Sequence, residues 1–261
     1  MIAVVGGGIS GLAMGHALAG KGTDVVVCEA SGRPGGVIGS VEVEGRVLEL
    51  GPQRARLTGP FRKAVRELGL EDQLLTSEEM PLYVWADGKL RLVPMSLGAA
   101  LRTDLIGWRD RFRALKEPFT GPLRPDETAA AFFTRKFGRR VYERVIAPLY
   151  GGLYASDPAE MPARHALAAT LETLGVRGSL LRAMIRGSGA RGGAPACSFH
   201  GGLQVLTDAL AARLGDRLRL NAPVRRLERD GAGFRLVLDD DVVACDAVVL
   251  TCPAGAAAAL L

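Results

Sequence analysis

The chain has 261 residues, of which 48% are hydrophobic and 23% charged, and its formal net charge is +5. This length suffices for one large domain or two smaller ones, and the composition is ordinary for a globular protein. Three histidines without paired spacing and four cysteines without a CxxC pair argue against a metal site and a disulfide framework. The basic residues are scattered and carry no recognition motif, which argues against nucleic-acid binding.

The N-terminal segment, residues 1–37, predicts a strand, a glycine-rich turn, a helix and a second strand. An apolar run at 2–5 precedes Gly6-Gly7-Gly8-Ile9-Ser10-Gly11, and the strand over 24–28 ends at Glu29. This order is typical of a dinucleotide-binding βαβ unit, in which the glycines allow a tight turn, close approach to a pyrophosphate and close helix packing. Glu29 is placed to bind an adenosine ribose, and its charge disfavours NADP. A glycine-rich turn that binds nothing is the alternative.

A second glycine pair, Gly35-Gly36, follows Glu29 within the same segment. This pair favours FAD over NAD, because a ligand that continues over the sheet edge needs a second close approach of the backbone. Strands at 41–43 and 47–49 are predicted to pair across the turn at 44–46. Gly51 follows that pair and would let the backbone approach a bulky ring.

Residues 101–116 predict a basic amphipathic helix. Leu101, Leu105, Trp108, Phe112 and Leu115 recur at helical spacing, and other faces carry Arg102, Arg109, Arg113 and Lys116. Such a helix can lie on an anionic membrane surface or pack its apolar face on a core, and both interpretations stay open. Further along, Asp126-Glu127-Thr128 predicts the start of another helix.

The C-terminal part predicts a helix over 203–214 and strands over 218–220, 234–238 and 242–250. These strands are expected to rejoin the first segment and complete the cofactor sheet. The predicted organisation is therefore a discontinuous cofactor domain, 1–55 and 200–261, with a helix-rich region, 56–199, between its parts. An alanine-rich helix begins at Ala254.

Several motifs together resemble those of the FAD-dependent amine-oxidase-like flavoproteins. The N-terminal stretches GGGISGLA, CEASGRPGG and ELGP carry the resemblance. Within that group the chain is most similar to the oxygen-dependent protoporphyrinogen oxidases, through GGLYASDP at 151–158, with Ser156 where glycine is usual, and FHGGL at 199–203. The resemblance implies an α/β fold: a Rossmann-like FAD-binding domain with an inserted helix-rich, α+β domain for substrate binding and membrane association. The C-terminal part of the family fold is expected to be missing after Leu261.

The resemblance also implies which residues bind FAD. Gly6 to Gly11 would hold the pyrophosphate, Glu29 the ribose and Val224 the adenine. Gly36 and Val37 would lie along the ribityl chain or the isoalloxazine, and 51–54 near the flavin ring, where Gln53 stands in place of an arginine of some members. The complete implied set is Gly6, Gly7, Gly8, Ile9, Ser10, Gly11, Glu29, Ala30, Arg33, Gly35, Gly36, Val37, Gly51, Pro52, Gln53, Arg54 and Val224.

The activity that the resemblance implies is oxidation of protoporphyrinogen IX or coproporphyrinogen III to the porphyrin in heme biosynthesis, with O2 as acceptor and H2O2 as product. The flavin would supply the chemistry, so no catalytic side chain is assigned, and His200 is a candidate base by proximity alone. Propionate groups call for arginine. Gly98 stands where the family has an arginine. Arg102, one helical turn later, is therefore the candidate for substrate binding, and the alternative is that Arg102 is a solvated surface residue.

Two other functions stay open at this stage. The chain could be a different flavin amine-oxidase-like enzyme, such as an amine oxidase or a carotenoid-type desaturase, or a shortened chain that binds FAD poorly and does not turn over. The expected partners are the porphyrinogen and O2, with peripheral membrane contact through 101–116 and a homodimer as further options. No signal peptide is recognised at the N-terminus, so the expected location is the cytoplasm or the cytoplasmic face of a membrane.

Overall fold

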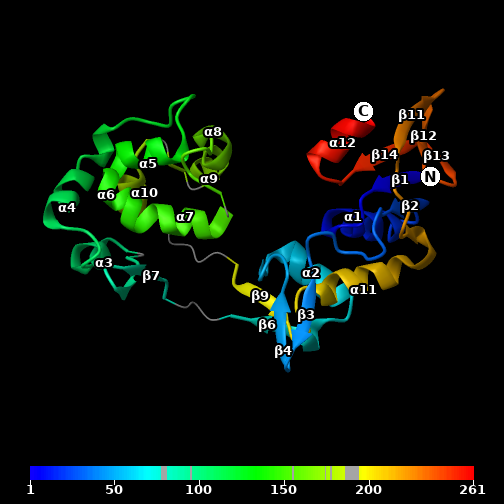
Figure 1. Cartoon of the computed structure of the whole chain (residues 1–261), viewed down its shortest axis with the longest axis horizontal. Coiled ribbons are helices and arrows are strands. Elements are labelled where there is room, and N and C mark those ends of the chain that lie inside the picture. The colour runs from blue at the N-terminus through cyan, green and yellow to red at the C-terminus, as the bar shows by residue number, and fades with distance from the viewer. Residues whose placement is uncertain (78–80, 95, 155, 174, 177, 186–193) are drawn as a thin grey trace. The chain divides into compact units, whose positions relative to one another are not determined.

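The computed structural model describes residues 1–77, 81–94, 96–154, 156–173, 175–176, 178–185 and 194–261. The chain forms two compact units (Figure 1). Unit 1 combines Met1–Glu78 with Ala194–Leu261, and unit 2 is Glu79–Gly193. In the part of the chain described, no helix combines the length and the apolar character needed to cross a membrane.

Unit 1 is built on a four-stranded parallel sheet. Its strands, in the spatial order β10-β2-β1-β14, are Leu218–Arg219, Val25–Cys28, Ile2–Val5 and Ala247–Leu250. The two central strands are almost wholly apolar, as expected for parallel strands that are covered on both faces. Alternate residues point to opposite faces, so Val4 and Val27 pack on one side while Ala3 and Val26 pack on the other.

Different layers cover the two faces of this sheet. Helices α1 (Ile9–Ala19) and α11 (Gln204–Leu214) pack on the Val4 face through residues such as Leu12 and Leu210. The Ala3 face is covered by an antiparallel sheet of β11 (Arg226–Asp230), β12 (Gly233–Val237) and β13 (Val242–Cys245). The short helix α12 (Ala254–Leu260) follows β14. The expected α/β cofactor fold is therefore confirmed as a three-layer arrangement.

The remaining elements of unit 1 join its two chain segments. β3 (Ser40–Val43) pairs with β4 (Arg46–Glu49) across the predicted turn, and β9 (Ala196–Phe199) lies between β5 (Ala55–Arg56) and β6 (Leu74–Thr76). Helix α2 (Gly59–Glu67), η1 (Glu71–Gln73) and η4 (Gly215–Arg217) complete the unit. Because β5, α2, β6 and β9 pack in unit 1, its boundaries lie at 78 and 194, whereas the sequence placed them at 55 and 200.

Unit 2 consists mainly of short helices around an aromatic core. A hairpin of β7 (Tyr83–Ala86) and β8 (Lys89–Leu92) precedes them. The buried core includes Phe132, Phe133 and Leu167. The helices are α3 (Leu97–Arg102), α4 (Trp108–Ala114), η2 (Glu117–Phe119), α5 (Ala129–Phe137), α6 (Arg139–Val141), the π-helix η3 (Tyr142–Ile146), α7 (Ala147–Tyr154), α8 (Ala163–Ala166), α9 (Ala168–Thr173) and α10 (Leu180–Ile185). Within the 151–158 motif, Ala155 lies outside the described residues.

The predicted helix start near residue 128 is confirmed. Thr128 is the N-cap of α5, and its hydroxyl oxygen accepts a hydrogen bond from the Ala131 amide at 3.2 Å. A threonine in this position satisfies an amide of the first turn, which has no acceptor inside the helix. The signal is local in sequence, which is why it could be read without the fold.

The predicted single helix over 101–116 is wrong. Helix α3 ends at Arg102, Thr103 is extended, and α4 begins only at Trp108 after its N-cap Gly107. Between them Leu105 and Ile106 are both buried in the core of unit 2. In one continuous helix Leu105 would share a face with Trp108 and Phe112, which are exposed. The break lets Leu105 and Ile106 enter the core while the apolar side chains of α4 stay at the surface.

The predicted strand over 242–250 is also divided. β13 ends at Cys245 and β14 begins at Ala247, in different sheets. Asp246 between them accepts a hydrogen bond from the N-terminal ammonium of Met1 at 2.5 Å. The expectation that the C-terminal strands complete the cofactor sheet is therefore correct for β10 and β14, whereas β12 and β13 belong to the antiparallel layer. The sequence did not indicate β11.

Candidate functional site

The glycine-rich turn after β1 carries the chain directly into α1. Gly6 has a positive φ of 107°, which glycine adopts without strain. A Cβ on Gly11 would lie 1.9 Å from the Gly6 carbonyl oxygen, so the first turn of α1 can pack against the strand end only with glycine there. The first intrahelical bond runs from the Leu12 amide to the Gly8 carbonyl, and the preceding amides have no acceptor within the helix. The turn therefore presents unpaired donors, as an anion-binding helix start requires.

Glu29, at the end of β2, is held beside this turn. Its carboxylate accepts hydrogen bonds from the Gly7 amide at 2.6 Å, the Ser31 amide at 2.8 Å and the Ser31 hydroxyl at 2.7 Å. Partial burial raises the pKa of Glu29, but the hydrogen bonds from Ser31 and Gly7 outweigh it, and the pKa lies below its ordinary value. The group is therefore a fixed carboxylate at neutral pH, ready to accept further hydrogen bonds.

The second glycine pair lies against the first turn. The Gly35 amide donates to the Gly7 carbonyl at 2.8 Å, and Gly8 and Gly35 form a bridge of parallel type. Arg33 donates from its guanidinium to the carbonyls of Gly36 and Ile38, each at 2.9 Å. The Arg33 side chain thus holds the backbone of the second turn in place. The two glycine turns lie side by side, and we call them together the rim of the site.

A cavity of about 780 Å³ opens beside this rim, within unit 1. Its size lies in the range of ligand pockets, roughly 300–1,000 Å³. The structure brings together at its wall ten of the residues that the sequence indicated: Gly6, Gly8, Ile9, Ser10, Glu29, Ala30, Gly35, Gly36, Val37 and Val224. The cavity lies at the carboxyl ends of parallel strands, where open α/β sheets bind their ligands. An extended dinucleotide fits this combination of unpaired amides, a carboxylate and apolar wall.

Part of the cavity wall was not anticipated from the sequence. It comes from the ends of β1 and β2, the segment beside Val224, the end of β14 and α12: Val5, Cys28, Pro223, Arg225, Thr251, Cys252, Pro253, Ala256, Ala259 and Leu260. Thr251 and Cys252 follow β14, which pairs in parallel with β1. The sequence does contain a feature that predicts Thr251 and Cys252 as cavity residues. They come just after an apolar strand, and such positions lie at the same sheet edge as the glycine turn.

Other residues of the predicted set lie away from the cavity wall. Gly7 packs on Glu29 and Gly11 on Gly6 and Thr251, so both shape the turn from behind. The segment 51–54 is exposed between β4 and β5, and a Cβ on Gly51 would lie 2.0 Å from the Val37 carbonyl oxygen. Arg102 is exposed at the end of α3, in unit 2. A role for these residues in binding stays a prediction.

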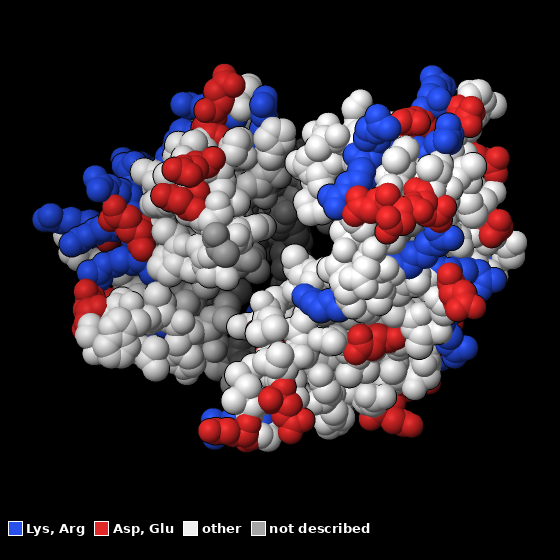
Figure 2. Space-filling view, turned by 45° about the vertical axis from the view of Figure 1, so that its right-hand side comes forward, with Lys and Arg blue, Asp and Glu red and all other residues white. Residues whose placement is uncertain are grey.

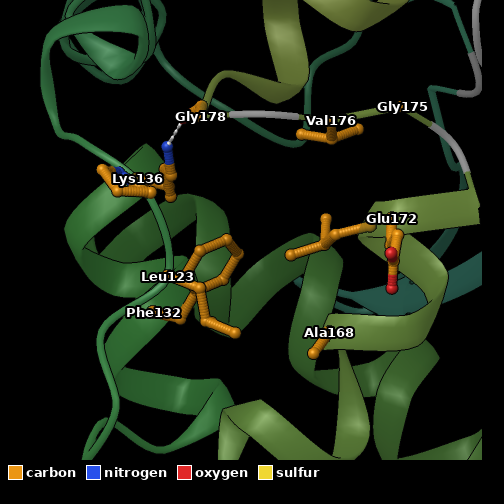
Figure 3. A pocket seen from close by; sticks show the side chains of 10 residues that line it. Leu123, Phe132, Lys136, Ala168, Glu172, Gly175, Val176 and Gly178 are labelled. Atoms are coloured by element: carbon orange, nitrogen blue, oxygen red, sulfur yellow. Dashed lines mark hydrogen bonds between the residues drawn. The ribbon is translucent and has the colours of Figure 1, made fainter.

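Unit 2 contains a second cavity, of about 520 Å³, between α5 and α9 (Figure 3). Leu123, Phe132 and Val176 give it an apolar wall, and the Lys136 side chain extends along one side toward Gly178. The Lys136 ammonium pairs with Glu117 Oε1 at 3.0 Å and donates to the carbonyls of Gly121, at 2.7 Å, and Gly178. All three ammonium protons of Lys136 therefore have acceptors within unit 2, and its charge is paired with Glu117. Lys136 thus stabilises the fold of unit 2 and has no proton left to donate to a ligand.

Comparison with known proteins agrees with this geometry. The family model described as flavin containing amine oxidoreductase matches residues 9–261. A chloroplastic protoporphyrinogen oxidase of Oryza sativa subsp. japonica is 32% identical over 99% of this chain and 53% of its own length. A coproporphyrinogen III oxidase of Staphylococcus aureus is 28% identical over 97% of this chain and 60% of its own length. The chain spans about half the length of the chloroplastic relatives that it matches.

A solved structure shares the fold of the whole chain. A crystal structure named provisionally as a protoporphyrinogen oxidase, from an Exiguobacterium species, superposes with a TM-score of 0.77 at 23% identity, covering 100% of this chain and 61% of that one. Together with the family match, this confirms the expected family and fold and supports FAD as the cofactor. The chain belongs to the family of flavin containing amine oxidoreductases.

Proposed function

We propose that this chain provides the FAD-binding part of a porphyrinogen oxidase. The observation that carries the proposal is the unit 1 cavity, where two glycine turns, the start of α1 and the fixed carboxylate of Glu29 lie together. Relatives named as protoporphyrinogen and coproporphyrinogen III oxidases support the reaction. The substrate is accordingly protoporphyrinogen IX or coproporphyrinogen III, oxidised to the porphyrin.

The protein's own residues have defined tasks in this proposal. The amides at the start of α1 bind the pyrophosphate, Glu29 binds the adenosine ribose, and the backbone beside Val224 borders the adenine. When bound, the flavin supplies the two-electron oxidation, and O2 takes up the electrons as H2O2. Arg102, exposed in unit 2, binds a propionate of the substrate as a charged hydrogen-bond donor.

The test is an anaerobic titration of the FAD-loaded protein with each porphyrinogen in turn. Loss of the visible flavin bands on addition of protoporphyrinogen IX or coproporphyrinogen III, and their return with H2O2 release when air is admitted, supports the proposal. Bands that bleach with amines and persist with both porphyrinogens would assign the chain to another oxidase of the family. Bands that persist with every substrate indicate that this chain binds FAD without turnover.

A membrane surface is a second candidate partner, on a separate observation in unit 2. Four large apolar side chains on and after α4 are strongly exposed: Trp108 at 63%, Phe112 at 64%, Leu115 at 63% and Phe119 at 83%. Arg109 lies over the Trp108 ring, with 5.2 Å between Cζ and the ring centroid. Figure 2 shows several basic side chains along the left edge of the view, with acidic ones among them and uncharged surface beside them. We propose that this face inserts into the headgroup region of an anionic membrane on its cytoplasmic side.

Replacing Trp108 and Phe112 together by serine should therefore weaken binding to phosphatidylglycerol vesicles at least about 100-fold, because each buried aromatic ring contributes more than the 1.4 kcal/mol that corresponds to tenfold. Co-sedimentation with vesicles of phosphatidylglycerol and of phosphatidylcholine measures the effect. Trp85→Ser is the matched control, since Trp85 is 68% exposed on the β7–β8 hairpin. Equal binding by the double variant and the unaltered chain, or an equal loss in the control, contradicts a specific role for α4.

A further inference from the structure

Thr251 connects the end of β14 to the glycine turn that follows β1, although 245 residues separate it from Gly6. Its amide donates to the Val5 carbonyl at 2.9 Å and continues the parallel ladder between the two strands. Its hydroxyl lies 2.9 Å from the carbonyl oxygens of both Val5 and Gly6. One hydroxyl proton is therefore shared between the last carbonyl of the strand and the first carbonyl of the turn.

The peptide bond between Gly6 and Gly7 is held on both of its sides. Its carbonyl oxygen accepts from the Thr251 hydroxyl, and its N–H donates to Glu29 Oε2 at 2.6 Å. Because a peptide unit is planar and trans, the direction of the carbonyl fixes the opposite direction of the N–H. The Thr251 hydroxyl thus sets where the Gly7 amide points, and through it where the Glu29 carboxylate is held.

The two hydrogen bonds are needed to hold this peptide plane because it has glycine on each side. Without a Cβ on either residue, the steric cost of rotating this peptide plane is small, and glycine reaches both signs of φ. A rotated plane would turn the Gly7 N–H away from Glu29 and place a carbonyl oxygen toward the cavity. A carbonyl lining a pyrophosphate site would repel the ligand that the amides attract.

We propose that Thr251 is a positioning residue of the dinucleotide site, which acts by locking the Gly6–Gly7 peptide so that the turn and Glu29 adopt their binding arrangement together. The inference rests on the proposed binding of FAD and adds to it a residue from the far end of the chain. A Cβ added to Gly11 would lie 2.7 Å from the Oγ1 atom of Thr251, so the Thr251 side chain also packs closely against Gly11. A small side chain with a hydroxyl is therefore what this position requires.

The test compares Thr251→Val, which keeps the shape and removes the hydroxyl, with Thr251→Ser, which keeps the hydroxyl. The dissociation constant for FAD, from quenching of flavin fluorescence, should rise on the order of 10-fold in Thr251→Val and stay within about 2-fold in Thr251→Ser. Thr173→Val is the matched control, because the Thr173 hydroxyl also donates to a backbone carbonyl, that of Ala169 at 2.8 Å, but lies in unit 2. It should leave FAD binding unchanged.

A second readout is independent of the cofactor. In the protein without FAD, the Gly7 amide should exchange its hydrogen about 10-fold faster in Thr251→Val than in Thr251→Ser, because its hydrogen bond to Glu29 opens more often. The inference is overturned if Thr251→Val changes neither the exchange rate of the Gly7 amide nor the affinity for FAD. An equal loss of FAD affinity in Thr251→Val and Thr251→Ser also overturns it, because the shape of the side chain and not its hydroxyl would then be the determinant. If the unaltered chain binds no FAD, the proposed function fails, and the exchange rates alone decide the role of Thr251.

Discussion

Replacing Gly11 by alanine should lower the affinity for FAD on the order of 100-fold, because this factor corresponds to about 2.8 kcal/mol, and each hydrogen bond to a charged group contributes about 1.5–3 kcal/mol. The added Cβ would meet the Gly6 carbonyl oxygen at 1.9 Å and the Thr251 hydroxyl at 2.7 Å. Neither neighbour is a flexible side-chain end, so the first turn of α1 must move away from the strand. This movement displaces the amides that would face the pyrophosphate.

Flavin fluorescence quenching measures the affinity, and Gly59→Ala serves as the control. Gly59 begins α2 in the same unit, and a Cβ there would have no neighbour within 4 Å. The control should bind FAD as the unaltered chain does and should be at least as stable, since alanine favours the helix. A Gly11→Ala protein that retains full affinity would show that the start of α1 does not contact the cofactor.

Replacing Lys136 by methionine should destabilise unit 2 by roughly 3–5 kcal/mol, the cost of leaving one partner of a buried ion pair alone. The side chains of Lys136 and Glu117 are 1% and 0% exposed. Glu117 also accepts from the Ser179 hydroxyl at 2.5 Å and from the Leu180 amide at 3.0 Å. Burial raises the pKa of Glu117, but these hydrogen bonds and Lys136 outweigh it and hold the pKa below its ordinary value.

Urea unfolding followed by tryptophan fluorescence measures this effect selectively, because both tryptophans, Trp85 and Trp108, lie in unit 2. Arg139→Met is the control in the same unit: Arg139 forms an exposed pair with Glu143, with the two side chains 83% and 48% exposed, and such pairs contribute about 0–1 kcal/mol. A double variant, Lys136→Met with Glu117→Leu, should recover part of the loss. An unfolding midpoint unchanged in Lys136→Met would mean that the pair does not hold unit 2 together.

The parts of the site that the sequence predicted are those that it encodes locally. Gly6 to Gly11, Glu29 and the Gly35–Gly36 turn lie within one short segment, and their order alone indicates a strand, a turn, a helix and a strand. The structure places all of them except Gly7 and Gly11, which shape the turn from behind, along one cavity wall. The N-cap at Thr128 and the β3–β4 turn are local in the same sense.

The parts that the sequence did not reveal depend on contacts between distant segments. Thr251 reaches the glycine turn because β14 pairs with β1 in parallel, a register that no local pattern encodes. The break between α3 and α4 arises because Leu105 and Ile106 enter the core of unit 2. The helical spacing of 101–116 is preserved within α4, but spacing alone does not show where a tertiary contact interrupts a helix.

The most direct test of a dinucleotide site in unit 1 is equilibrium binding of FAD, FMN and ADP to the purified chain. The cavity walls include the first glycine turn, Glu29 and the segment beside Val224, which we assign to the pyrophosphate and adenosine parts. We therefore expect FAD to bind with quenched fluorescence, ADP to compete with it, and FMN, which lacks the adenosine, to bind at least about 100-fold more weakly. Equal binding of FMN and FAD, or no binding of FAD and ADP, would contradict the account.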